Sequence, residues 1–508
     1  MSKIGDMRGY LASLIGVACA AVLAVPPASP AMAAGSGAGP DVPGSTQSLP
    51  LVALTGPRGG GAVTERGLTP RAVRSFSLVG VVWDDPRTEL HGRVQIRTRA
   101  SGTDRWSDWQ EVETHNTDHG PDLGTTEAGS SRVRGSTAPL WVGDCDGIEV
   151  RVRAEQDDSG GTRGPGLPGG LRVELVDPGA EPAGTSAHGA QDKGSAGAPG
   201  LDASGTGSDV DASNTGSGVD ASGTGSGAGA SGAGSGAGAS GTGSGAGASN
   251  AGSGVDASNA GSGAVSAASE ASAANAGLAP LGAAEIPALT RKATKEDLAA
   301  RQVSTGPYIG PRPRIVTRSG WGADESLREA GFVYTDTVKV AFVHHTASGN
   351  NYTCSQVPSL IRSIYRYHVV SSGWRDIGYN FLIDKCGSIY EGRAGGVEKA
   401  VMGAHTLGFN GNSTGIAVLG TYTGSNPTAA AVTAISKLTA WKLGLSSMDP
   451  RAATHLVSGG GNLYAKGENV RLNVISGHRD GFATECPGRL LYGKLGSARA
   501  TAAAYQGR

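Results

Sequence analysis

The sequence VKVAFVHH at residues 338–345 decides the fold of the C-terminal half of the chain. Five of its first six residues are apolar, and a short run rich in valine predicts a strand. Because neighbouring side chains of a strand point to opposite faces, His344 and His345 at its end are expected to face different ways. His344 shares a face with Val340 and Phe342, so it is the better candidate for a site at this end of the strand. His345 is assigned a supporting or structural role.

Strands and helices alternate outward from this run. Further strand-like runs are YNFLID at 379–384, GIAVLG at 415–420 and LNVIS at 472–476. One helix is expected from near Pro358, where apolar residues recur at helical spacing, a second from Thr428 to Leu445, and a third after Gly488. This alternation predicts an α/β domain over residues 311–503, with a mixed central sheet flanked by helices.

The N-terminal end has the pattern of a signal peptide over residues 1–33. Positively charged residues come first, an apolar stretch runs from Leu11 to Val25, and AMA at 31–33 is a small-x-small cleavage site. The apolar stretch is too short to favour a membrane span, and no later stretch is apolar enough for one. A lipid attachment site at Cys19 is the weaker alternative. The protein is therefore expected to be secreted or associated with the cell wall.

Residues 48–178 predict an all-β domain with a sandwich-like architecture. Its strand-like runs are FSLVGVVW at 76–83, VQIR at 94–97, IEVRV at 148–152 and LRVEL at 171–175. The last three alternate apolar and polar residues, as half-buried strands do, and turn-rich clusters separate them. Four tryptophans gather here, at positions 83, 106, 109 and 141. They either pack in the core, which is the favoured interpretation, or form a face that binds sugars.

Composition marks residues 180–285 as a linker between these domains. The chain has 508 residues but 84 glycines and only 5% aromatic residues, which indicates a long segment that cannot bury a core. A nine-residue unit repeats seven times from Leu201 to Gly263. Several units lack the bulky apolar residue and the aspartate of a calcium-binding β-roll, so a disordered Gly/Ser/Ala linker is favoured. With a span on the order of 50–60 Å, it would let the two domains move separately.

The segments GHRD at 477–480 and CP at 486–487 carry the second part of the candidate site. His478 ends a predicted strand, and Cys486 follows eight residues later, a gap that suits a loop folding back over a metal held on a sheet. Two imidazoles and one thiolate are a ligand set that zinc favours where a fourth position stays open for water. The alternative is an exposed histidine and a disulfide-bonded cysteine.

Seven ordered blocks between residues 318 and 488 resemble the peptidoglycan recognition protein and phage-lysozyme amidase family. The blocks are RSGWGA at 318–323, FVHHTA at 342–347, GWRDIGYNF at 373–381, YEGR at 390–393, GAH at 403–405, GHRD at 477–480 and CPG at 486–488. The long extension before the domain resembles exported actinobacterial members. The resemblance implies an N-acetylmuramoyl-L-alanine amidase fold with a zinc site.

Matched residue by residue, the resemblance implies that His344, His478 and Cys486 bind zinc and that Tyr379 is the active-site tyrosine. Thr484 stands where phage enzymes carry a lysine, and many recognition-protein amidases also have threonine there. Without the lysine, more of the stabilisation of the oxyanion falls on zinc and Tyr379. Family members that only bind peptidoglycan typically lack the cysteine ligand, so Cys486 favours catalysis.

The resemblance also implies contacts with the substrate. Arg393, His405 and Asn410 fall where the family lines its peptide groove. Many members tuned to meso-diaminopimelate have Gly-Trp after the matching arginine, whereas this chain has Ala-Gly-Gly at 394–396. The preference for one type of stem peptide therefore stays open.

The cysteines divide between these roles. The family often has a disulfide in the region of Cys354 and Cys386, and an exported protein keeps such a bond. Cys145 is left over, either as a buried free thiol or as an intermolecular link.

Together these features predict a secreted, monomeric zinc amidase of peptidoglycan whose N-terminal domain docks on the cell wall or on a glycan. The formal net charge of −1 gives no overall basic field for nucleic acid, so nucleic-acid binding is not expected. The alternatives are a peptidoglycan-binding receptor without activity and a structural surface protein.

Overall fold

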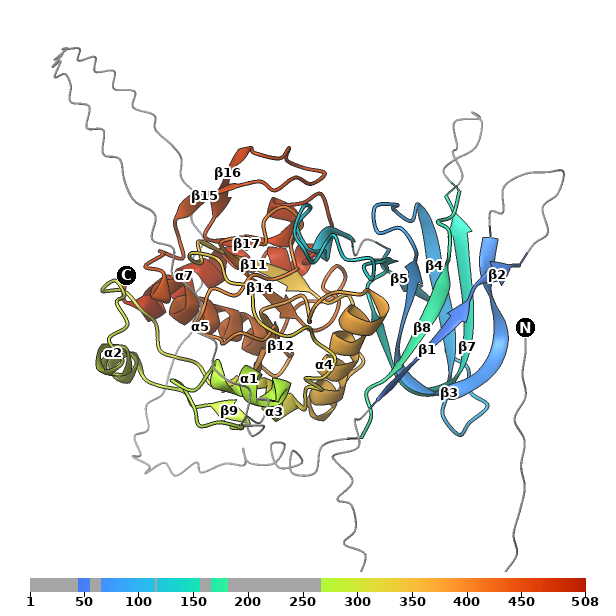
Figure 1. Ribbon diagram of the computed structural model, residues 1–508, viewed down its shortest axis with the longest axis horizontal. Coiled ribbons are helices and arrows are strands. Elements are labelled where there is room, and N and C mark those ends of the chain that lie inside the picture. The colour runs from blue at the N-terminus through green and yellow to red at the C-terminus, as the bar shows by residue number, and fades with distance from the viewer. Residues whose placement is uncertain (1–43, 55–64, 115–116, 156–165, 181–265) are drawn as a thin grey trace, which may run out of the picture. The chain divides into compact units, whose positions relative to one another are not determined.

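Figure 1 shows the computed structural model, which describes residues 44–54, 65–114, 117–155, 166–180 and 266–508. The run VKVAFVHH at 338–345 contains β11 (Val340–His345), a fully buried strand. It lies in a seven-stranded sheet of order β17-β11-β14-β12-β13-β10-β9. The other strands are β9 (Glu285–Ile286), β10 (Ile315–Val316), β12 (Phe381–Ile383), β13 (Ile389–Glu391), β14 (Ser413–Val418) and β17 (Ile475–Gly477). β11 runs parallel to β14 and β17, and β12 runs antiparallel to β13, so the sheet is mixed as expected.

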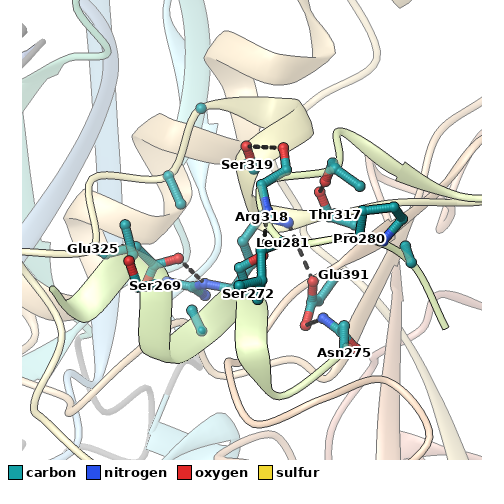
Figure 2. Close-up of a pocket in the computed structure, with 17 residues that line it drawn as sticks. Ser269, Ser272, Asn275, Pro280, Leu281, Thr317, Arg318, Ser319, Glu325 and Glu391 are labelled. Carbon is teal, nitrogen blue, oxygen red and sulfur yellow. Dashed lines mark hydrogen bonds and ion pairs between the residues drawn. The ribbon is translucent and has the colours of Figure 1, made fainter. Parts of the chain in front are cut away.

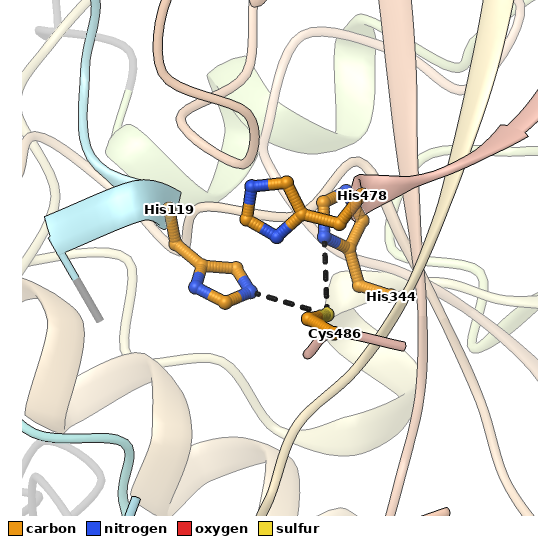
Figure 3. A group of neighbouring side chains, drawn as sticks. All are labelled: His119, His344, His478 and Cys486. Carbon is orange, nitrogen blue, oxygen red and sulfur yellow. Dashed lines mark hydrogen bonds between the residues drawn. The ribbon is translucent and has the colours of Figure 1, made fainter. Parts of the chain in front are cut away.

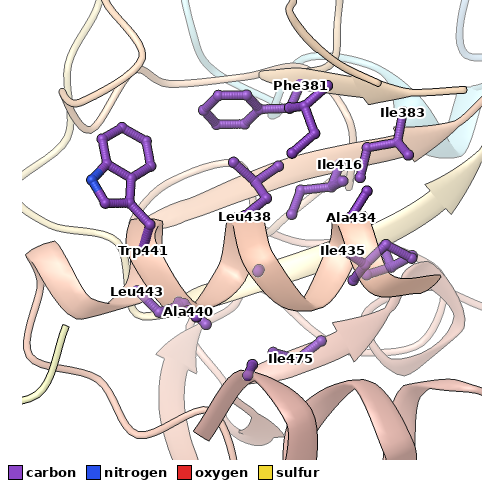
Figure 4. Packing of buried hydrophobic residues seen from close by; sticks show 14 of the residues in the cluster. Phe381, Ile383, Ile416, Ala434, Ile435, Leu438, Ala440, Trp441, Leu443 and Ile475 are labelled. Atoms are coloured by element: carbon purple, nitrogen blue, oxygen red, sulfur yellow. The ribbon is translucent and has the colours of Figure 1, made fainter. Parts of the chain in front are cut away.

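Helices cover both faces of this sheet. α5 (Ala429–Leu445) packs its apolar side chains on Phe381 and Ile383 of β12 (Figure 4). Leu382 lies between these two residues and points to the other face, where it joins the cluster of α4 (Val357–Arg366). The predicted helices near Pro358 and over 428–445 are therefore confirmed as α4 and α5. The remaining elements of this half are η2 (Cys354–Gln356), η3 (Tyr367–Ser371), β15 (Ala453–Val457), β16 (Asn469–Asn473), η4 (His478–Asp480), α6 (Arg489–Tyr492) and α7 (Leu495–Gln506).

The folded C-terminal half begins earlier than the composition indicates. The composition predicts a linker over residues 266–285, but these residues contain α1 (Ala267–Ala273) and the start of β9. The Asn275 side chain donates to the Glu391 carboxylate (2.8 Å), and both residues line a pocket of about 280 Å³ (Figure 2). Further on lie α2 (Arg291–Ala300) and α3 (Arg318–Trp321). An alanine-rich helix held by tertiary contacts has the same composition as a linker, which is why the boundary was wrong.

Other expectations lie outside the described residues. These are the signal peptide over 1–33, Cys19 and the repeats of the linker. In the described residues, no helix is long and apolar enough to cross a membrane.

The N-terminal half is all-β, as expected. Its strands are β1 (Ser45–Pro50), β2 (Val52–Ala53), β3 (Glu65–Trp83), β4 (Gly92–Ala100), β5 (Gln110–Val112), β6 (Gly135–Ser136), β7 (Leu140–Ala154) and β8 (Arg172–Asp177). All eight belong to one hydrogen-bonded antiparallel sheet, because the long strand β3 pairs with β2, β6, β7 and β8. Trp83 and Trp141 are buried, whereas Trp106 and Trp109 are half-buried beside Arg97.

The two halves share a hydrophobic core. Leu78, Val82, Trp141 and Val176 of the N-terminal sheet belong to the same buried cluster as the apolar face of α4. The Tyr367 hydroxyl donates to the Thr137 carbonyl across this boundary (3.0 Å). Gly44–Arg508 accordingly forms one compact unit, which differs from the expectation of two domains that move separately.

Candidate metal centre and the groove around it

The three predicted ligands lie together at the ends of two adjacent strands. β11 and β17 run parallel with Val343 opposite Gly477, so the next residues along, His344 and His478, lie side by side. Cys486 reaches the same point from the loop that follows, with its sulfur 3.8 Å from His344 Nδ1. All three side chains are fully buried. Strand register therefore explains why His344 and His478, which are 134 positions apart, can meet, and the predicted cluster exists.

A fourth residue, which the sequence analysis missed, completes the cluster. His119, in η1 (Thr117–His119) of the N-terminal half, points its Nε2 at the Cys486 sulfur from 3.7 Å (Figure 3). The ligand atoms of His119, His344, His478 and Cys486 all lie within 4.8 Å of one another. The sequence signal for His119 is no more than the pair Asp118-His119, with no spacing that relates it to the C-terminal motifs.

The geometry of the cluster fits a zinc ion. With bonds of about 2.0–2.1 Å to nitrogen and about 2.3 Å to sulfur, tetrahedral zinc sets an N···S separation of about 3.5 Å, close to the distances found here. His478 Nε2 faces the carbonyl oxygen of Asp118 (3.1 Å), which can only accept, so Nδ1 keeps its lone pair. That Nδ1 is buried without a hydrogen-bond partner among the described residues. An unpartnered buried acceptor is expected where a metal completes the site.

Electrostatics also suit a metal. Burial lowers the pKa of His478 to about 3 and that of His344 well below its usual value, so both rings are neutral, as metal ligands must be. Burial raises the pKa of the Cys486 thiol. The thiolate would therefore form together with metal binding, which releases a proton.

The other predicted catalytic residues adjoin this cluster. The Tyr379 ring lies 5.6 Å from the His344 ring, and burial raises the pKa of its hydroxyl, which stays protonated and able to donate. Thr484 accepts a hydrogen bond from the Cys486 backbone N–H (3.3 Å). His345 points away from the cluster. Its Nδ1 accepts from the Tyr422 N–H (3.3 Å), as the alternation of a strand predicts.

The predicted substrate contacts are buried. His405 packs behind His344 with ring centroids 5.2 Å apart, so it supports a ligand and faces no open groove. Arg393 and Asn410 contact the N-terminal half: Arg393 pairs with Glu127, and the Asn410 amide donates to Asp122 (2.7 Å).

The cysteines outside the cluster lie as follows. Cys354 and Cys386 form a disulfide with an S–S distance of 1.98 Å, the pairing that the resemblance implies. Cys145 is a buried free thiol in the core of the N-terminal sheet.

Comparison with known proteins identifies the family. Residues 334–489 match a family described as N-acetylmuramoyl-L-alanine amidase. Peptidoglycan-recognition protein SC2 of Drosophila simulans is 33% identical over 181 residues, which cover 36% of this chain and 84% of that protein. The chain belongs to the peptidoglycan recognition protein family. An N-acetylmuramoyl-L-alanine amidase of Homo sapiens is 32% identical over 187 residues, 36% of this chain and 28% of that protein.

Two further matches complete the comparison. Residues 30–184 match a family described as Rv3811 N-terminal galactose-binding domain-like, in line with the sheet-rich N-terminal half. The solved structure of Drosophila PGRP-LB is 27% identical over 36% of this chain and 93% of that chain, with a TM-score of 0.28.

Proposed function

We propose that the protein is a secreted, zinc-dependent N-acetylmuramoyl-L-alanine amidase that acts on peptidoglycan. The observation that carries the proposal is the meeting of His344, His478 and the Cys486 thiol in one buried cluster, with Tyr379 beside it. The family includes members that bind without cleaving, and the cysteine ligand favours the catalytic kind.

The reaction adds water across the amide between the lactyl group of N-acetylmuramic acid and L-alanine, and releases an acid and an amine. Zinc held by the three residues would supply Lewis acidity at the carbonyl and acidify water. Tyr379, kept protonated by burial, donates to the oxygen on which negative charge develops. Thr484 orients Cys486 through its backbone N–H.

The N-terminal half has a separate role in this proposal. Its match to a galactose-binding domain-like family supports docking on the cell wall or on a surface glycan by a monomeric enzyme. The half-buried pair Trp106 and Trp109 beside Arg97 offers aromatic surface for such a contact.

The test is mass analysis of purified peptidoglycan after incubation with zinc-loaded protein, with and without a chelator. The chain is assayed as wild type and as His119→Ala, because the His119 Nε2 atom lies 3.7 Å from the Cys486 sulfur in the same cluster. Release of stem peptides with a free L-alanine amine is expected from at least one of these two forms, and adding Cys486→Ser to that form should abolish the release together with zinc binding. Cys145→Ser, which alters the other buried free thiol, is the matched control and should keep both. Intact linkages with both assayed forms, alongside retained binding of the wall, would instead identify a receptor.

A further inference from the structure

We propose that His119 is a fourth ligand of the metal and that residues 118–129, here called the plug, occupy the substrate groove, so that this conformation is latent. The metal part of the proposal depends on the cluster alone. The latency part also depends on the proposed function, because it concerns access of peptidoglycan to that site.

The orientation of His119 is that of a metal ligand. Its Nδ1 donates to the Asp118 carboxylate (2.8 Å), which leaves the lone pair on Nε2, the atom that faces Cys486. Metal-binding histidines are usually held in this way, with the second ring nitrogen bonded to a carboxylate. The His119 side chain is 6% exposed and that of Asp118 is 2% exposed, so the pair is held deep in the protein and not on its surface.

A fourth protein ligand changes the kind of site. Zinc sites with four protein ligands are closed and structural, whereas catalytic sites keep one position for water or substrate. The three C-terminal residues are the open set, and His119 enters from the side that remains. The N-terminal half thus completes the cluster at the position that hydrolysis requires to be free.

The backbone of the plug is bound to the C-terminal half next to the metal cluster. The carbonyl of Asp118 accepts from the Leu407 N–H (2.9 Å) as well as from His478 Nε2. The Gly120 carbonyl accepts from the Asn410 amide (3.0 Å). His478 and Asn410 therefore both use side-chain hydrogen bonds to hold the plug.

Two carboxylates extend these contacts along the groove. Asp122 accepts from the Asn410 side chain and from the Gly408 N–H, both at 2.7 Å. Glu127 pairs both of its oxygens with the Arg393 guanidinium, at 2.9 Å each, and accepts from the Arg375 N–H (3.1 Å). Two of the three predicted substrate contacts are thus satisfied by acidic side chains of the same polypeptide.

These contacts make the plug a competitor of the substrate. The Arg393 side chain is only 4% exposed, and an anionic group of a peptide can reach it only where Glu127 leaves. Beside the plug a pocket of about 920 Å³ remains, lined by Leu123 and Gly124 of the plug and by Trp374 and Phe482 of the C-terminal half. Movement of the plug into or out of this space is a smaller change than separation of the two halves, which share a core.

The experiment compares the full chain with His119→Ala, Glu127→Ala and a matched control, His91→Ala. His91 is an exposed histidine of the same sheet domain, outside the plug. The first readout is zinc affinity by competition with a chromophoric chelator, together with the visible spectrum of the cobalt-substituted protein. His119→Ala should bind zinc at least about tenfold more weakly, with an altered cobalt spectrum, and His91→Ala should match wild type. Equal zinc affinity and equal spectra in all forms would overturn the assignment of His119 as a ligand.

The second readout is binding of a soluble muramoyl-peptide fragment to the metal-free proteins by calorimetry. Glu127→Ala should bind it at least about tenfold more tightly than wild type and His91→Ala, because the plug loses its ion pair with Arg393 and the closed population competes less. Equal affinities would overturn latency.

Amidase activity separates the two proposals: activity equal in wild type and plug variants contradicts latency alone. Absence of activity in every form, with the expected change in zinc affinity, contradicts the proposed function alone.

Discussion

Glu127 and Arg393, which are 266 residues apart in the sequence, form a bidentate ion pair between the N-terminal sheet domain and the groove of the C-terminal domain. The side chains are 10% and 4% exposed. A pair this buried depends on both partners, because removal of one leaves the other charge desolvated. The ion pair therefore couples the position of the plug to the electrostatics of the groove.

The first prediction measures this coupling by a double-mutant cycle. Glu127→Ala should lower the free energy of unfolding by about 2–3 kcal/mol, slightly less than loss of a fully isolated buried partner, because Arg393 also donates to the Ile377 carbonyl. The double variant Glu127→Ala, Arg393→Ala should lose less free energy of unfolding than the two single variants lose together. The difference should be about 1 kcal/mol or more. Urea unfolding measures each value. Asp84→Ala, which breaks an exposed pair with Arg172, is the control and should cost under about 1 kcal/mol. Strict additivity of the two changes would show that the pair does not stabilise the domain contact.

The second prediction concerns Tyr379. Tyr379→Phe removes the hydroxyl but keeps the ring that packs 5.6 Å from the His344 ring. Measured in the His119→Ala background, turnover of a muramoyl-peptide substrate should fall about 10²- to 10³-fold, the usual effect of losing one donor to an oxyanion, with zinc content unchanged. Kinetics and metal analysis on the same preparation check both. A loss of zinc in parallel with activity would mean that the residue acts through the structure of the site.

The third prediction concerns the disulfide. Closing a loop of about 30 residues between Cys354 and Cys386 should contribute roughly 3–4 kcal/mol of stability in the chain-entropy model. The double variant Cys354→Ser, Cys386→Ser should therefore unfold at lower urea concentration, while a reducing agent has the same effect on wild type and none on the variant. An unchanged unfolding midpoint would contradict the prediction.

The fourth prediction concerns a buried lysine far from the metal. Lys442 in α5 donates to the carbonyls of Val397 and Lys399 (2.7 Å each), and burial lowers its pKa from 10.5 to about 7, partly offset by Glu398. Between those values the unfolded chain binds a proton that the folded chain does not. Stability should therefore rise with pH across this window, by roughly 1.4 kcal/mol per pH unit near its middle.

Substitution tests the assignment of that pH dependence. In Lys442→Met, the free energy of unfolding should no longer rise between pH 7 and 10.5, because the lysine with the lowered pKa is gone. Lys437→Met, in the same helix but exposed, should keep the slope of wild type. Urea unfolding at a series of pH values gives both slopes, and an equal slope in Lys442→Met and wild type would assign the dependence to another group.

Much of the C-terminal fold and three of the four cluster residues could be predicted from the sequence. The apolar run of β11 and the alternation around it are local patterns, and His344 and His478 directly follow runs that form adjacent strands. The alternation of a strand also separated His344 from His345 correctly. These features are encoded within a few residues of where they act.

The linker boundary and the state of the groove could not be predicted in this way. Residues 266–285 have the composition of a linker, and only contacts such as that of Asn275 with Glu391 make them part of the folded domain. Arg393 and Asn410 were expected to meet substrate, and the acidic side chains that they meet come from a segment without any recognisable motif.

The family, the α/β character of the C-terminal domain and the candidate cluster of His344, His478 and Cys486 could all be predicted from local patterns in the sequence. The contact of His119 with Cys486, and the contacts of Glu127 and Asp122 with Arg393 and Asn410, appear only in the folded chain. His119 comes close to the cluster only because the two halves of the chain pack against each other. This packing depends on a core that Leu78 and Val82 share with the apolar face of α4. Such a contact leaves no periodicity or spacing in the sequence, because its partners are far apart along the chain and meet only when the two halves pack together.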